Sequence, residues 1–323
     1  MFQANLKDLL VVIPYSNTCR YRRRQQLGEQ FVAMVKASGV DYILVEIALG
    51  DRPFEITKPG TNDLQLRTVD EFFHKENGIR LGIQRGRTLF PGKKMVAYID
   101  ADCAPVGRSF QEWMEETWHQ LQHYEAVQMW EWLQPLDINL NPLGSPSPSF
   151  ISNYIKFGTP YPKPGLGYPN QWGSPGLAWA FNLSAYDQIG GIPDAHPLGS
   201  GDWYLAHMMI GEIKDIPDTN LAKYTADFRN YWLNYQVLCD RWIRRDVGFV
   251  PGLYTHFFHG KIVNRGYNTR DAILIDNKFS QLTDLKRDSQ GLWQIERIEP
   301  RQIKMYDQIR GYMRQRNEDS IDS

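Results

Sequence analysis

The stretch VAYIDADCAP, residues 96–105, decides the fold class. A hydrophobic run leads directly into two aspartates, Asp100 and Asp102, and Pro105 ends the run. This pattern predicts a buried strand with an acidic loop at its carboxyl end. An unpaired charge buried there would cost several kcal/mol, so both carboxylates need a cation, a basic residue or bulk water beside them.

Strand and helix signals alternate on both sides of this stretch. Helical spacing of apolar residues predicts a helix that stops at Gly39 and another over 108–124. Alternating strands and helices predict an α/β fold with a mostly parallel sheet covered on both faces, whose ligands bind at the carboxyl ends of the strands. Besides the strand before Asp100, short strands are expected over residues 9–14, 41–48, 63–69 and 126–130.

The second half of the chain begins with a change of composition. Residues 134–176 are rich in proline, glycine and aromatic residues, which predicts a long irregular loop that serves as a lid or a binding loop. A strand over 176–184 follows, then helices that end near Gly190, Met209 and Leu238. A last helix is expected from Pro300, with its end fraying over 316–323.

Composition and charge narrow the protein class. The chain has 323 residues and 42% hydrophobic residues, enough for a full-sized core, and its formal net charge of −1 gives no general attraction to nucleic acid. No run approaches the ~20 apolar residues that span a bilayer, so no integral membrane contact is expected. The three scattered cysteines fit neither a disulfide framework nor a zinc site and favour a reducing, cytoplasmic location.

Two carboxylates in i, i+2 spacing at a strand end can face the same ligand. Oxygen ligands of this kind suit Mg²⁺ or Mn²⁺, and such a cation often completes its coordination with substrate phosphate oxygens. A D-x-D pair alone is a weak signal, and a turn or capping role is the alternative. Its place after a hydrophobic strand favours a cation bound together with a diphosphate.

Further motifs in this order resemble glycosyltransferases of the GT-A fold. The motifs are VVIPYSN at 11–17, AYIDAD at 97–102, GSGDW at 199–203 and HGKIVNRGY at 259–267, with HKEN at 74–77 between them. The resemblance is to the large inverting group, family 2-like, in a version found in tailed phages and bacteria. It implies a GT-A catalytic domain over 1–260, divided into a nucleotide-binding half (1–133), the mobile loop (134–176) and an acceptor half (177–260), with a helical extension over 261–323.

The resemblance also assigns roles to individual residues. It places Asp102 and His259 at the metal, and Asp202 as the general base, although only Gly201 precedes Asp202 where the family often has a second acidic residue. For Asp202, capping of the following helix is the competing explanation. The residues that the resemblance places at the nucleotide-sugar are Pro14, Tyr15, Asn17, Glu46 and Asp100. Arg265 is a further candidate, because it lies in a basic stretch after His259 where a cation can neutralise charge on a leaving diphosphate.

Several of these assignments have structural alternatives. Asn17 can stabilise a turn, and Glu46 can be a solvated carboxylate at a strand end. His256 and His259 would face opposite sides of a strand, so only His259 is expected to be a ligand. The arginines at 20–24 are most simply the solvated start of a helix, although they can also contact a phosphate.

The function expected from the sequence is transfer of a sugar from a nucleotide-sugar donor, a UDP-sugar, with Mn²⁺ or Mg²⁺ as cofactor and inversion at the anomeric carbon. The acceptor is either a glycan or a hydroxymethylated pyrimidine in phage DNA, which would have to be flipped out of the duplex. Two alternatives stay open: a nucleotidyltransferase that makes the sugar nucleotide, and a non-catalytic carbohydrate-binding protein.

Overall fold

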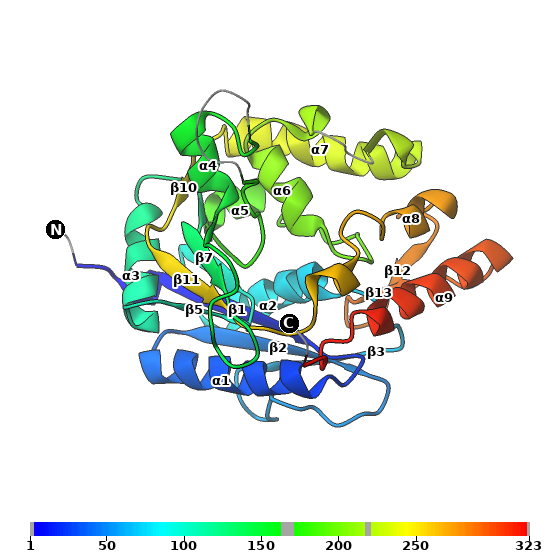
Figure 1. Ribbon diagram of the computed structural model, residues 1–323, viewed down its shortest axis with the longest axis horizontal. Helices are drawn as coiled ribbons and strands as arrows, with labels where there is room; N and C mark the ends of the chain where they lie inside the picture. Colours follow the sequence, from blue (N-terminus) through cyan, green and yellow to red (C-terminus); the bar gives the residue numbers. More distant parts are fainter. Residues whose placement is uncertain (1–2, 163–170, 217–220, 322–323) are drawn as a thin grey trace.

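The computed structural model describes residues 3–162, 171–216 and 221–321, and a central β-sheet runs through it (Figure 1). Among the described residues this sheet has seven strands in the order β10-β6-β9-β4-β1-β2-β3. Neighbouring strands are parallel except where β9 pairs with β4 and β6. The strands are β1 (Leu9–Ser16), β2 (Tyr42–Leu49), β3 (Leu64–Thr68), β4 (Met95–Ile99), β6 (Ala126–Gln128), β9 (Ala178–Asn182) and β10 (Val247–Phe249). The predicted α/β class with a mostly parallel sheet is confirmed.

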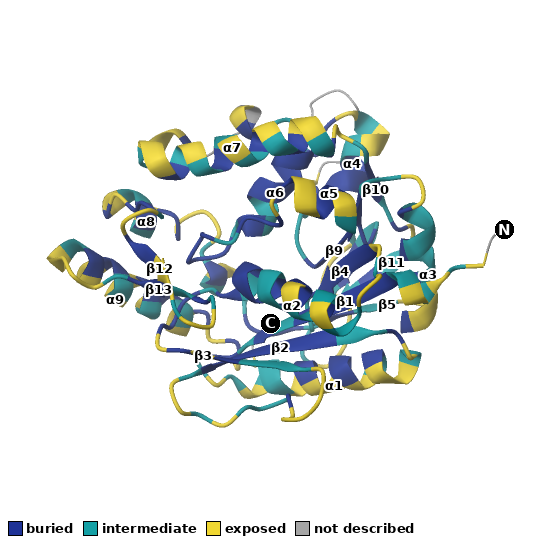
Figure 2. Ribbon diagram, turned by 180° about the vertical axis from the view of Figure 1, so that it is seen from behind, coloured by how far each residue is buried: buried dark blue, intermediate teal, exposed yellow. Residues whose placement is uncertain are grey.

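Helices cover both faces of the sheet, so its strands are buried on two sides (Figure 2). Along β1, Leu10 and Val12 belong to one hydrophobic core while Leu9, Val11 and Ile13 belong to the other. This explains why the strands are continuous apolar runs rather than alternating ones. The first core includes residues of α2 (Lys75–Leu89), α5 (Leu183–Gln188), α6 (Gly201–Met209) and α7 (Ala226–Trp242), and the second those of α1 (Arg22–Ser38) and α3 (Phe110–Gln120).

Helix α2 is not among the helices predicted from the sequence. Gly78, Gly82 and Gly86 lower its helix propensity, but they share one face of the helix and lie against β1 and β2. A Cβ at Gly82 would lie 2.6 Å from side-chain carbons of both Val12 and Val45. The glycines therefore allow a close approach of helix and sheet, and this approach fixes the position of the first turn of α2.

Residues 134–176 are more regular than their composition indicates. A second sheet, in the order β5-β11-β7-β8, combines β5 (Cys103–Pro105), β7 (Trp132–Pro135), β8 (Ser147–Pro148) and β11 (Leu253–His256). Helix α4 (Phe150–Phe157) follows β8, and Ser149 caps it. The prediction of one long irregular loop is therefore wrong for the described residues, and its remaining part, 163–170, lies outside them.

The part of the chain after Gly260 packs beside the central sheet and is only partly helical. It contains the 3₁₀ helix η4 (Ile262–Arg265), α8 (Ala272–Asp276), a hairpin of β12 (Leu285–Arg287) and β13 (Trp293–Ile295), and α9 (Pro300–Gln315). The expected fraying after α9 is wrong for 316–319, because Arg316 and Glu318 are buried. None of the helices in the described parts of the chain is both long and apolar enough to cross a bilayer.

Candidate functional site

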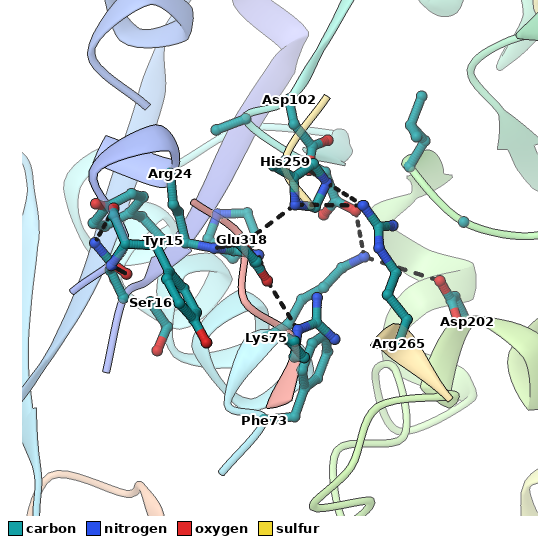
Figure 3. Close-up of a pocket in the computed structure, with 18 of the residues that line it drawn as sticks. Tyr15, Ser16, Arg24, Phe73, Lys75, Asp102, Asp202, His259, Arg265 and Glu318 are labelled. Atoms are coloured by element: carbon teal, nitrogen blue, oxygen red, sulfur yellow. Dashed lines mark hydrogen bonds and ion pairs between the residues drawn. The ribbon is translucent and has the colours of Figure 1, made fainter. Parts of the chain in front are cut away.

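A cavity of about 350 Å³ lies at the carboxyl ends of β1 and β4. It is the place where ligands bind in sheets of this kind. Its lining includes every residue predicted from the sequence except Glu46, namely Pro14, Tyr15, Asn17, Asp100, Asp102, Asp202, His259 and Arg265. Figure 3 shows several of these side chains pointing toward one another.

Asp102, His256 and His259 form a cluster of possible metal ligands. One ligand atom from each lies within 4.8 Å of the others. His259 Nε2 is 2.9 Å from Asp102 Oδ2, and His256 Nε2 is 3.3 Å from His259 Nε2. The antiparallel pairing of β5 with β11 creates this proximity, because it sets His256 opposite Cys103, the residue after Asp102.

The expectation that only His259 faces the site is corrected by this geometry. Strand β11 ends at His256, so the alternation of a strand does not extend to His259 and both rings turn toward Asp102. Burial lowers the pKa of His256 to about 3, which leaves its ring neutral at physiological pH. A neutral imidazole is the form that binds metal ions.

The residues of this cluster fit a divalent cation. Asp102 Oδ1 is buried and has no hydrogen-bond partner among the described residues, which is costly unless a ligand approaches it. Burial tends to raise the pKa of Asp102, but His259 and His256 outweigh it and hold this pKa below its usual value. A carboxylate with two imidazoles suits Mn²⁺ better than Mg²⁺, because Mg²⁺ prefers oxygen ligands.

Lys75 connects the first aspartate of the D-x-D pair to Asp202. Its Nζ lies 2.7 Å from Asp100 Oδ2 and 4.0 Å from Asp202 Oδ2. Burial lowers the pKa of Lys75, but the two carboxylates outweigh it and raise this pKa above its usual value, so the ammonium stays charged. Asp100 is therefore paired with a lysine rather than with the cation cluster. Lys75 lies in the motif HKEN, but the sequence assigned it no role because helix α2 was not predicted.

Glu76 is a second cavity residue from the first turn of α2. Its side chain is buried against Gly201, where a Cβ would lie 2.8 Å from Glu76 Oε1. Burial raises the pKa of Glu76 to about 8, with Lys75 opposing this rise and Asp202 adding to it. The carboxyl group is therefore largely protonated at neutral pH and can donate a hydrogen bond into the cavity.

Asp202 is the second residue of α6, and Ser200 occupies the N-cap position. Asp202 Oδ1 accepts a hydrogen bond of 2.8 Å from the backbone N–H of Trp203, whereas Oδ2 faces Lys75. Ser200 has a φ of 76°, a left-handed conformation that non-glycine residues rarely adopt, and its Oγ accepts a hydrogen bond from Arg270. The turn before α6 thus directs one carboxylate oxygen of Asp202 into the cavity.

The loop after β1 combines a ligand-facing surface with internal hydrogen bonds. Tyr15 and Asn17 both donate to Glu55, and Asn17 Oδ1 accepts from the backbone N–H of Tyr21 at 2.8 Å. Asn17 therefore has the turn-stabilising role that was the alternative to ligand contact. Both residues still line the cavity.

Glu46 does not line the cavity, and the expected contact with a nucleotide base is corrected. Its carboxylate is 2% exposed and accepts hydrogen bonds from Ile56 N at 3.1 Å and from Thr57 N at 2.8 Å. These bonds hold the segment after β2 in place. The sequence could not show this, because the donors are backbone groups of a loop without a motif.

Several arginines face the cavity. Arg265 and Arg270 are each 9% exposed, and the Nε of each is buried without a partner among the described residues. Arg24 turns inward to Glu318, and Arg23 donates to the carbonyl of Phe258, so this part of the 20–24 run is not a solvated helix start. The cavity therefore contains guanidinium groups that can meet an anionic ligand.

Glu318 lies among these basic groups although it is distant in the sequence. Burial would raise its pKa, but Arg24 and Arg316, followed by His259, lower the pKa of Glu318 well below its usual value. The carboxylate is therefore ionised in the folded protein. No sequence pattern indicated this residue.

Comparison with known proteins gives matches only among solved structures. No protein-family model and no curated protein matches the chain. The chain is similar to a putative nucleotide-diphospho-sugar transferase from Desulfovibrio desulfuricans, with 11% identity over 94% of this chain and 98% of that chain and a TM-score of 0.32.

Two further solved structures align over most of the chain. One is the catalytic domain of Drosophila β1,4-galactosyltransferase 7 in complex with xylobiose, with 14% identity over 92% of this chain and 98% of that chain and a TM-score of 0.36. The other is glucosyl-3-phosphoglycerate synthase from Mycobacterium tuberculosis with Mn²⁺, UDP-glucose and phosphoglyceric acid, with 11% identity over 90% and 87% and a TM-score of 0.42. TM-scores this low establish neither a family nor an activity for this chain.

Proposed function

We propose that the protein is a metal-dependent glycosyltransferase that uses a nucleotide-sugar donor, a UDP-sugar, and inverts the anomeric carbon. The observation that carries the proposal is the arrangement of the cavity. The Asp102–His256–His259 cluster lies on one side, and the Lys75–Asp202 pair lies in the same cavity. A cation site for a diphosphate and a carboxylate for an acceptor hydroxyl are the two parts that such a transfer needs.

The donor would be held by the cluster and by the arginines. Asp102, His256 and His259 would bind Mn²⁺, which supplies Lewis-acid stabilisation of the negative charge on the leaving diphosphate. Arg265 and Arg270 would donate to phosphate oxygens through their unpartnered Nε groups. Pro14, Tyr15 and Asn17 would contact the nucleoside.

Asp202 would act as the general base. The acceptor oxygen forms a bond to the anomeric carbon, the bond from that carbon to the diphosphate breaks, and the acceptor proton moves to Asp202 Oδ2. The Lys75 ammonium, 2.7 Å from Asp100 Oδ2 and 4.0 Å from Asp202 Oδ2, would help to position Asp202 for this step. A single displacement of this kind inverts the anomeric configuration.

The acceptor side is rich in aromatic rings. Trp203 follows Asp202, and the ring centroids of Trp203 and the 46% exposed Trp172 are 6.2 Å apart. Tyr161 packs against Trp172 at 4.9 Å. Trp172 is exposed and Trp203 and Tyr161 are half-buried, and although none of them lines the cavity, Trp203 is the neighbour of Asp202 in the chain. Aromatic rings beside the base suit a sugar ring, so we propose a glycan acceptor. A hydroxymethylated pyrimidine in phage DNA, which can also stack on aromatic rings, is the second acceptor to test.

The two other functions considered from the sequence are less consistent with the cavity. A nucleotidyltransferase usually has a glycine-rich phosphate loop after its first strand, whereas residues 14–24 contain no glycine. A non-catalytic sugar-binding protein would have no use for a buried carboxylate oxygen without a partner, such as Asp102 Oδ1.

Calorimetry and a transfer assay test the proposal together. We expect wild-type protein to bind UDP only when Mn²⁺ is present, and Asp102→Asn to lose most of this binding while its melting temperature stays within a few degrees of wild type. Mass spectrometry of reactions with a panel of nucleotide sugars, a glycan pool and hydroxymethylated DNA identifies donor and acceptor. If the variant binds UDP and Mn²⁺ as tightly as the wild type, the metal assignment is wrong. Release of pyrophosphate, with formation of a nucleotide sugar from a sugar phosphate, would show a nucleotidyltransferase instead.

A further inference from the structure

We propose that Glu318 is a positioning residue for the cation site: it holds the His259 ring so that Nε2 faces the cation. This inference rests on the proposed metal-dependent function. It adds a residue from the segment after α9, residues 316–319, to a site whose other parts follow β4 of the central sheet and end or follow β11 of the second sheet. Figure 3 shows Glu318 between Arg24 and His259.

Glu318 is fixed by two arginines. Its side chain is 3% exposed, Arg24 Nε donates to Oε2 at 2.8 Å, and Arg316 Nε donates to Oε1 at 2.8 Å. Arg316 is itself buried. A carboxylate clamped between two guanidinium groups stays ionised, so it can only accept hydrogen bonds.

The His259 ring lies between this carboxylate and the cation cluster. Nδ1 is 3.2 Å from Glu318 Oε2, a distance at which a ring N–H can donate to this carboxylate. Nε2 lies 2.9 Å from Asp102 Oδ2 and 3.3 Å from His256 Nε2. A guanidinium nitrogen of Arg265 lies beside the ring, 2.9 Å from Nε2 and 3.5 Å from Nδ1. Contact between Glu318 and Nδ1 therefore leaves Nε2 directed at the cluster. Metal-binding histidines are commonly oriented in this way by a carboxylate on the second ring nitrogen.

The segment that carries Glu318 is docked at several other points. Asp319 accepts hydrogen bonds from the backbone N–H groups of Arg22 and Arg23, at 2.9 and 2.8 Å, and so caps the start of α1. A Cβ at Gly260 would lie 2.9 Å from the Cα of Glu318, so this glycine permits the segment to pass directly beside His259. Asp319 therefore attaches the segment to α1, whereas Glu318 contacts His259. Mutation of one residue or the other can separate these two effects.

The test compares Glu318→Gln with Asp319→Asn, which removes a charge from the same segment without touching His259. Mn²⁺ affinity is measured by calorimetry, and the melting temperature is measured without metal. Loss of a carboxylate behind a metal-binding histidine typically lowers affinity 10- to 100-fold, so we expect a loss of this size in Glu318→Gln and less than 2-fold in Asp319→Asn. Glu318→Asp keeps the charge between the arginines and shortens the reach to His259. It should fold and still lose affinity.

A spectroscopic measurement separates positioning from general stability. In the Zn²⁺-loaded protein, we expect the Nδ1 proton of His259 to exchange slowly with water in the wild type and in Asp319→Asn, and rapidly in Glu318→Gln and Glu318→Asp. Equal Mn²⁺ affinities in all proteins, or equal losses in the Glu318 and Asp319 variants, would overturn the positioning role while leaving the metal site intact. A wild type that binds no Mn²⁺ would instead contradict the proposed function itself.

Discussion

Glu76 should make the stability of the protein fall as pH rises from 5 to 8. Its folded-state pKa is raised by burial from 4.5 to about 8, so the folded protein keeps a proton that the unfolded chain loses. A raised pKa of this kind contributes stability that is fully present below pH 4.5 and is lost as pH rises through 8. Each unit of difference corresponds to about 1.4 kcal/mol, which gives a loss of roughly 2–4 kcal/mol across this range after allowing for the nearby charge of Lys75.

Glu76→Gln removes the titrating group and retains the shape of the side chain. Urea unfolding of both proteins at pH 5, 6, 7 and 8 measures the effect, and we expect the variant to gain stability relative to the wild type with each step. Glu71→Gln is the matched control. The pKa of Glu71 is lowered in the fold: burial raises it, but Arg314 outweighs burial. The stability that Glu71 contributes is present above pH 4.5 and is lost only as pH falls. The stability of Glu71→Gln should therefore change with pH in parallel with that of the wild type between pH 5 and 8. A constant difference between Glu76→Gln and wild type over the four pH values would refute the reasoning.

Three further predictions concern the helix packing and the reaction. Gly82→Ala should destabilise the protein by about 1–3 kcal/mol in thermal unfolding, because the new Cβ overlaps the sheet. Gly311→Ala in α9 is the control: open space surrounds Gly311, so this variant should be more stable than the wild type by roughly 0.5–1 kcal/mol. Asp202→Asn should still bind UDP with Mn²⁺ in calorimetry and lose roughly 10²- to 10⁴-fold in transfer rate, and near-normal turnover would exclude Asp202 as the base. Lys75→Met should cost about 1–3 kcal/mol because it leaves Asp100 without its partner, and combining it with Asp100→Asn should recover part of that loss in a double-mutant cycle.

The sheet could be predicted from the sequence because its strands are buried on both faces. Continuous apolar runs such as residues 9–14 are typical of strands buried on both faces. Helix α2 could not be predicted by the same reasoning. Its glycines lower helix propensity, and their benefit, close contact with β1 and β2, exists only in the folded protein.

The cavity was predictable where its residues follow strands. Asp100 and Asp102 follow the end of β4, and the rule that ligands bind at strand ends locates them. His256 was missed because the position where β11 ends is set by pairing with β5 and not by a local signal. Glu318 was missed because a short charged segment after a helix has the composition of a frayed end, and only its distant partners Arg24 and His259 give it a defined place.

The cavity is assembled from parts of the chain that are far apart, since Asn17, Lys75, Asp102, Asp202 and Glu318 all line it. A ligand that touches several of them acts as a non-covalent cross-link across most of the sequence, because these segments can separate only after the ligand leaves. Its binding energy would therefore slow global unfolding and protect amides in β1 and β4 from hydrogen exchange, rather than stiffening one loop. Proteolytic resistance of the whole chain thus becomes a direct readout for screening candidate donors and acceptors.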